Sequence, residues 1–101
     1  MRQLKHPDID DVPLTAVLHA LSDPVRLAIV RMAARQPDQP CSAFLSQIPK
    51  STLSHHWRVL RDAGLIRQVS AGREKLNTLR KDELDARFPG LLDAVLASAE
   101  H

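Results

Sequence analysis

The sequence is poor in the residues that build disulfide frameworks, metal cages and aromatic cores. Its 101 residues include one cysteine, Cys41, three glycines and only three aromatic side chains. A single thiol cannot form an internal disulfide and cannot supply the two or three thiolates that soft metals prefer. No apolar run approaches the roughly 18 residues of a membrane span, and the first residues contain no apolar signal segment. We therefore expect a cytoplasmic chain without a disulfide scaffold, a membrane partner or a cofactor.

The remaining composition is typical of one soluble globular domain over residues 1–101. Hydrophobic residues make up 44% of the chain and charged residues 26%, and a domain of this length has no room for a second core. A small chain buries a modest share of its surface. Because the core is also short of aromatics, we expect association with a second copy to help stabilise it.

Charge is distributed unevenly, although the net charge is only +2. Residues 1–49 carry five basic and five acidic side chains and are neutral. Residues 50–81 carry eight basic and two acidic side chains, a net of +6, whereas residues 82–101 have a net of −4. A basic third of this kind is typical of a polyanion-binding surface. A solvated charged face is the alternative, so the placement of the charges decides between them.

Prolines and apolar spacing predict a first pair of helices. Pro13 suits the start of a helix with apolar residues at helical spacing. Asp23 suits an N-cap with Pro24 in the first helical position, because the carboxylate accepts from backbone N–H groups that have no helical partner. The segment that follows is apolar on nearly all sides, which predicts a central buried helix.

The rest of the chain is predicted to consist of short helices and one β-hairpin. The segment 36–40 contains two prolines and is expected to be a loop. The other expected elements are a short helix Ser42–Gln47, a helix from Lys50 to Ala63 stopped by Gly64, two strands around Ala71-Gly72, a helical turn Lys81–Phe88 and a last helix from Leu91. This order, mainly α with a small β-hairpin (α-α-α-α-β-β-α), defines a winged helix-turn-helix.

The helix from Lys50 has two chemically different sides. On a helical wheel Leu53, Trp57 and Leu60 cluster on one side and are expected to face the core, with His56 packed on the flank. The residues on the opposite side are Ser51, Ser54, His55, Arg58 and Asp62. Hydroxyls, an imidazole and a guanidinium are groups that bond base edges or phosphates in a major groove.

Three segments resemble a known family. They are ALSDPVRLAIV at 20–30, STLSHHWRVLRDAGLI at 51–66 and the hairpin residues AGRE at 71–74. In unbroken order over residues 14–80, the chain resembles the ArsR-type (ArsR/SmtB) winged helix-turn-helix transcriptional repressors. The resemblance implies a homodimer whose helix from Lys50 enters the major groove and whose hairpin wing reaches the adjacent DNA backbone or minor groove.

The resemblance also points to individual DNA contacts. It implies contacts by Lys50, Ser51, Ser54 and His55, and the wheel independently selects the last three of these and adds Arg58. By their location, Arg73 at the wing tip and Lys75 are expected to contact phosphates.

The sequence departs from the family where many relatives bind metal. The stretch CSAFLSQI at 41–48 has one thiol, and the last helix offers Asp93 and Glu100 before His101. Zinc requires about four ligands at compatible spacing, so we expect no metal site. A thiol-based redox response of Cys41 is left as an alternative. Pro49 stands where the family usually has a serine or a similar capping residue, so we expect the start of the helix to be less well fixed.

A dimer surface is expected from the first and last helices, because their apolar stripes exceed what a chain of this size hides. The candidate interface residues are Leu14, Val17, Leu18, Leu91, Leu92, Val95 and Leu96. Packing of the two helices within one chain is the alternative. A symmetric dimer would place its recognition helices about 34 Å apart and favour an inverted-repeat operator in double-stranded DNA.

Two other classes of function are weaker alternatives. Ser51, Ser54 and His55 share one helix face with neither a glycine-rich phosphate loop nor paired carboxylates, so we do not expect an enzyme. A winged-helix module for protein contacts or RNA is the second alternative, although this face carries no outward aromatic side chain for base stacking.

Overall fold

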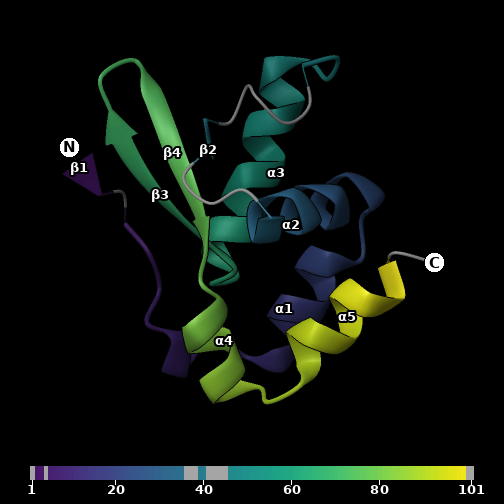
Figure 1. Cartoon of the computed structure of the whole chain (residues 1–101). Coiled ribbons are helices and arrows are strands. Elements are labelled where there is room, and N and C mark those ends of the chain that lie inside the picture. Colours follow the sequence, from purple (N-terminus) through teal and green to yellow (C-terminus); the bar gives the residue numbers. More distant parts are fainter. Residues whose placement is uncertain (1, 4, 36–38, 41–45, 100–101) are drawn as a thin grey trace.

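The computed structural model describes residues 2–3, 5–35, 39–40 and 46–99. In chain order the elements are β1 (Arg2–Gln3), the 3-10 helix η1 (Ile9–Asp11), α1 (Leu14–Leu21), α2 (Pro24–Arg35), β2 (Gln39–Pro40), α3 (Lys50–Asp62), β3 (Ile66–Ala71), β4 (Glu74–Leu79), α4 (Lys81–Arg87) and α5 (Leu91–Ala99). Figure 1 shows the β3–β4 hairpin projecting from a body made of helices. The predicted mainly α fold with a small hairpin is confirmed.

The predicted junction between the first two helices is confirmed. Asp23 Oδ1 accepts hydrogen bonds from the backbone N–H groups of Val25 at 2.8 Å and Arg26 at 3.1 Å. The bond from Arg26, followed by that from Val25, lowers the pKa of the Asp23 carboxyl below its usual value. The central position of α2 is also confirmed, because Ile29 and Val30 are fully buried.

Helix α3 begins and ends through different local chemistry. At its start, Pro49 makes no side-chain cap hydrogen bond. At its end, the N–H of Gly64 donates to the carbonyl of Arg61 and the N–H of Leu65 donates to the carbonyl of Leu60. This pair of bonds is a Schellman motif, which requires a left-handed residue, and Gly64 has φ +78°. The predicted stop at Gly64 is therefore confirmed.

In the described part of the chain, the sheet has four strands in the order β1-β3-β4-β2, two more than the sequence predicted. The hairpin closes through a two-residue turn, Gly72-Arg73, between the paired residues Ala71 and Glu74. The segment 36–40 was expected to be a loop, but Gln39 pairs with Asn77 of β4. That expectation was wrong for Gln39–Pro40. A proline has no N–H to donate, but β2 lies at the edge of the sheet, where proline is tolerated.

The second unpredicted strand, β1, pairs with β3 through Arg2 opposite Ser70 and Gln3 opposite Val69. Two-residue strands carry no periodicity for a sequence pattern to detect. The predicted helix Ser42–Gln47 lies mostly outside the described residues, and its last two residues, Ser46 and Gln47, form a turn.

Two arginines and one carboxylate attach α4 to the sheet. Glu83 accepts a hydrogen bond from Arg67 at 2.6 Å and two more from the buried Arg80. Arg80 also donates to the carbonyl of Pro7. The hydrogen bond from Arg80 lowers the pKa of Glu83 below its usual value; burial opposes this shift, and the hydrogen bond from Arg67 adds to it. The predicted helical turn at Lys81–Phe88 is thus a helix, Lys81–Arg87, anchored by charge-assisted bonds.

The core lies between the helices and the base of the hairpin. Its most deeply buried hydrophobic side chains are Val17, Ala20, Ile29, Val30, Leu60, Leu65 and Ile66. Within the described part of the chain, none of the helices combines the length and apolar character needed to cross a membrane.

Candidate nucleic-acid interface

Helix α3 has the two sides that the sequence predicts. Leu53, Trp57 and Leu60 are 6%, 3% and 0% exposed and face the core. Every residue predicted to project outward is exposed, namely Ser51, Ser54, His55, Arg58 and Asp62. Lys50, the first residue of the helix, is exposed as well. The surface of α3 that is open to a partner therefore consists of short polar groups and basic groups, with the acidic Asp62 at its C-terminal end.

The wing tip projects on the same side of the molecule as the start of α3. In Figure 1 the N-terminal end of α3 and the β3–β4 turn both lie at the top, away from α1 and α5. Arg73 is exposed in the two-residue turn. Lys75 pairs with Ser70 in the hairpin, and its side chain lies outside the described part of the chain. One face of the molecule thus presents α3 and the wing together.

A buried arginine fixes α3 to the helices beneath it. Arg26 and His56 are 7% and 8% exposed, and Nη1 of Arg26 lies 3.2 Å from Nδ1 of His56. Arg26 also donates to the carbonyls of Ala20 at 2.7 Å and His19 at 3.3 Å. The prediction that His56 is packed with one hydrogen-bonded nitrogen is confirmed. Arg26 was not among the predicted site residues: it is one of three arginines in the otherwise apolar α2, and the helical sequence does not distinguish it from Arg31 and Arg35.

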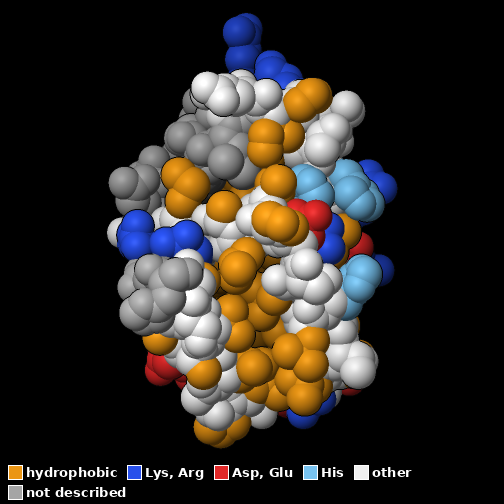
Figure 2. Space-filling view, turned by 90° about the vertical axis from the view of Figure 1, so that its right-hand side faces the viewer, with side chains coloured by type: hydrophobic (Ala, Val, Ile, Leu, Met, Phe, Trp, Pro, Cys, Tyr) orange, Lys and Arg blue, Asp and Glu red, His pale blue; other side chains and the backbone are white. Residues whose placement is uncertain are grey.

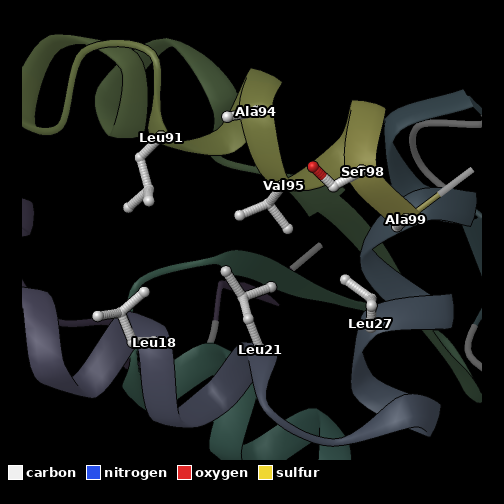
Figure 3. Close-up of a pocket in the computed structure, with 8 residues that line it drawn as sticks. All are labelled: Leu18, Leu21, Leu27, Leu91, Ala94, Val95, Ser98 and Ala99. Carbon is white, nitrogen blue, oxygen red and sulfur yellow. The ribbon is translucent and has the colours of Figure 1, made fainter. Parts of the chain in front are cut away.

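An apolar groove of about 470 Å³ lies on the face that carries α1 and α5. In Figure 3 leucines of α1 and α2 point toward leucine and valine side chains of α5. The lining residues are Leu18, Leu21, Leu27, Leu91, Ala94, Val95, Ser98 and Ala99. Figure 2 shows hydrophobic side chains gathered on this face. Leu18, which lines the groove, is 45% exposed, and Leu14, one turn earlier on α1, is 44% exposed.

The structure separates the predicted interface residues into two groups. Val17 and Leu92 are 1% and 3% exposed, so they belong to the core of their own chain. The prediction that these two residues lie at a dimer interface was therefore wrong. Their sides of the helices face inward, which the apolar stripe alone did not reveal. The other candidates remain accessible at the exposed or half-buried positions Leu14, Leu18, Leu91, Val95 and Leu96.

The residues relevant to thiol and metal chemistry lie partly outside the described part of the chain. Cys41 lies outside the described residues. Among the residues that are described, no three His, Cys, Asp or Glu side chains gather closely enough to hold a metal ion.

Comparison with known sequences identifies a helix-turn-helix protein. A family model described as a helix-turn-helix domain matches residues 21–69. The uncharacterised HTH-type transcriptional regulator YceK of Bacillus subtilis is 32% identical over 94 residues, which cover 85% of this chain and 89% of that protein.

Comparison with solved structures agrees. An ArsR family transcriptional regulator has a TM-score of 0.67 and 26% identity, covering 86% of this chain and 91% of its own. An ArsR-like transcriptional regulator from Rhodococcus sp. RHA1 has a TM-score of 0.60 and 28% identity, covering 86% and 89%. The transcriptional repressor BigR from Xylella fastidiosa shares the fold at a TM-score of 0.60 and 24% identity, covering 74% and 85%. The chain therefore belongs to the ArsR-type family of helix-turn-helix transcriptional regulators and is a regulator, not an enzyme.

Proposed function

We propose that this chain is a homodimeric transcriptional repressor that binds an inverted-repeat operator in double-stranded DNA without a bound metal. The observation that carries the proposal is the two-sided burial of α3. Leu53, Trp57 and Leu60 anchor one side in the core, while Ser54 and His55 project from the other. A helix held in this way can enter a major groove without unfolding any part of the body.

Each exposed group has a role that its chemistry allows. Ser54 and His55 exchange hydrogen bonds with base edges, and Arg58 binds a guanine edge or a phosphate. At the start of α3, Pro49 provides no side-chain cap, so Lys50 and the N–H groups of the first turn favour a phosphate there. Arg73 contacts the backbone beside the groove. The net charge of +6 over residues 50–81 supports binding to a polyanion.

The groove between α1 and α5 supports the homodimer. Exposed leucines beside an apolar groove are typical of surfaces that a partner covers, and Leu14 and Leu18 are nearly half exposed. In the proposed dimer, the α1 and α5 helices of a second copy cover this face. Two-fold symmetry then sets the recognition helices about one DNA turn apart, about 34 Å. Repression follows from occupancy of the promoter in the cytoplasm.

The test is a mobility-shift titration with duplexes selected from random sequence, repeated at several salt concentrations. Binding through 6 to 10 phosphates predicts a loss of roughly 10³- to 10⁵-fold in affinity between 50 and 200 mM salt. A scrambled duplex of the same length is the control for specificity. Absent binding, or binding that salt does not weaken, would instead favour a winged-helix module for protein contacts.

A further inference from the structure

Two amide side chains are buried in the middle of the wing hairpin. Gln68 of β3 and Asn77 of β4 are 1% and 0% exposed and lie directly opposite each other. The inward positions nearer the body, Ile66 and Leu79, are apolar. Glutamine and asparagine are mostly exposed in folded proteins, so their burial at paired positions requires a specific arrangement of partners.

The partners connect α3 to both strands of the wing. Arg61, in the last turn of α3, donates from Nη1 to Oε1 of Gln68 at 2.9 Å. Gln68 in turn donates from Nε2 to Oδ1 of Asn77 at 2.9 Å. We call Arg61, Gln68 and Asn77 the amide relay. The backbone N–H of Gln68 also donates to Nε2 of His6 at 2.8 Å, so the N-terminal segment is fixed to the same point of β3.

Hydrogen bonds constrain geometry more strictly than apolar contacts do. Leucines in place of the two amides would fill the space, but they would pack almost equally well after a small rotation of the hairpin. Donors and acceptors in a buried site must keep their distance and angle, because a lost bond leaves a desolvated polar group. The amide relay therefore favours one angle between the wing and α3.

We propose that the amide relay is the positioning device that holds the wing at a fixed angle to α3, so that both elements dock on one DNA half-site as a single rigid body. The inference rests on the proposed DNA binding. Gln68 and Asn77 touch no DNA themselves, because they are buried. Their effect passes through the placement of Arg73 at the wing tip.

The test is a double-mutant cycle of Gln68→Met with Arg73→Ala. Methionine has a similar length but cannot accept from Arg61 or donate to Asn77. In the wild-type protein, Arg73→Ala reduces the slope of log affinity against log salt by about 1, the expected result of losing one phosphate contact. In the Gln68→Met protein, the same change should have less than half of that effect, because the wing no longer keeps Arg73 on the backbone. An undiminished Arg73 effect in folded Gln68→Met would overturn the proposal.

Two further variants separate positioning from general stability. Val69→Ala alters the next residue of β3, a half-buried side chain on the opposite face of the strand. It should lower the melting temperature and leave the Arg73 effect intact, and loss of that effect in this control would contradict the relay. Arg61→Met breaks the α3 end of the relay, along with a 4.0 Å contact between Arg61 and the exposed Asp62. In Arg61→Met, Arg73→Ala should likewise have less than half of its wild-type effect on the salt slope. This variant provides the test if Gln68→Met does not fold.

A measurement without DNA distinguishes failure of the relay from failure of the proposed function. Residual dipolar couplings report the orientation of the β3–β4 amides relative to those of α3. The wild-type couplings should fit one common alignment, whereas those of the hairpin in Gln68→Met or Arg61→Met should shrink and fit a separate one. Unchanged couplings in the variants would exclude the relay even if the protein bound no duplex.

Discussion

Nη1 of Arg26 lies 3.2 Å from Nδ1 of His56, in a buried contact that joins α2 to α3. A guanidinium can only donate hydrogen bonds, so Nδ1 of His56 is the acceptor. The same guanidinium donates to the carbonyls of Ala20 and His19 near the end of α1. One side chain thus joins three helices, and the orientation of α3 depends on it.

Arg26→Met should destabilise the folded protein by about 2 to 4 kcal/mol, because it leaves two carbonyls of α1 and the ring nitrogen of His56 in α3 without their donor. Urea unfolding monitored by circular dichroism measures the change. Arg58→Met is the matched control for stability, since Arg58 is exposed on α3, and it should alter the free energy of unfolding by less than about 0.5 kcal/mol. Equal stabilities of the two variants would show that the three-helix contact contributes little.

Ser54→Ala and His55→Ala should weaken binding to the selected operator by about 1 to 3 kcal/mol each and weaken binding to scrambled DNA much less. Arg73→Ala should weaken binding to both duplexes similarly, because a phosphate contact carries no sequence information. Fluorescence anisotropy titrations with the two duplexes provide the comparison. Equal losses on both duplexes for all three variants would refute the division into base and phosphate contacts.

Leu18→Asp should convert the dimer into a folded monomer. Leu18 is 45% exposed in the single chain, so a carboxylate there stays hydrated in the monomer but would be buried against a second copy. Sedimentation velocity gives the mass of the particle. Thr15→Asp, at another exposed position of α1, controls for added charge. A monomeric wild type, or a Leu18→Asp dimer, would remove this face from the proposed interface.

Glu83→Gln should lower stability at neutral pH by about 1 kcal/mol, since Glu83 is the partly screened partner of Arg80 and Arg67. The folded-state pKa of Glu83 lies below its ordinary value in an unfolded chain. Its contribution is therefore complete above that value and is lost as the pH falls through the folded pKa.

Urea unfolding of wild type and Glu83→Gln over a series of pH values tests this linkage. The difference in stability should narrow on acidification, because protonated Glu83 resembles glutamine. Asp82→Asn changes an exposed carboxyl in the same helical turn and serves as the control. A difference that stays constant with pH would contradict the assignment to the Glu83 carboxylate.

Gly64→Ala should lower the free energy of unfolding by about 2 to 3 kcal/mol, whereas Gly72→Ala should lower it by about 1 kcal/mol. Both glycines have positive φ, but a Cβ on Gly64 would lie 3.1 Å from Ile9 Cδ1 and 3.1 Å from Val12 Cγ2, whereas a Cβ on Gly72 would meet nothing within 4 Å. Thermal unfolding of the two variants compares them directly. Equal costs would mean that the backbone conformation, and not the packing against η1, sets the requirement at Gly64.

Local chemistry in the sequence determined the helix boundaries and the two sides of α3. The Asp23-Pro24 start of α2 and the stop at Gly64 depend on caps that involve only neighbouring residues. The separation of Leu53 and Trp57 from Ser54 and His55 follows from the helical repeat alone. The residues proposed to read DNA could therefore be identified without a structure.

The tertiary structure decided which distant segments meet. The strands β1 and β2 exist only because β3 and β4 offer edges for them to pair with, and no local pattern marks a strand of two residues. An apolar stripe on α1 does not distinguish buried Val17 from exposed Leu18, since that depends on where α2 and α5 pack. Likewise the contact between Arg26 and His56 and the amide relay join residues from separate elements, because a buried polar group finds its partner only when the chain has folded around it.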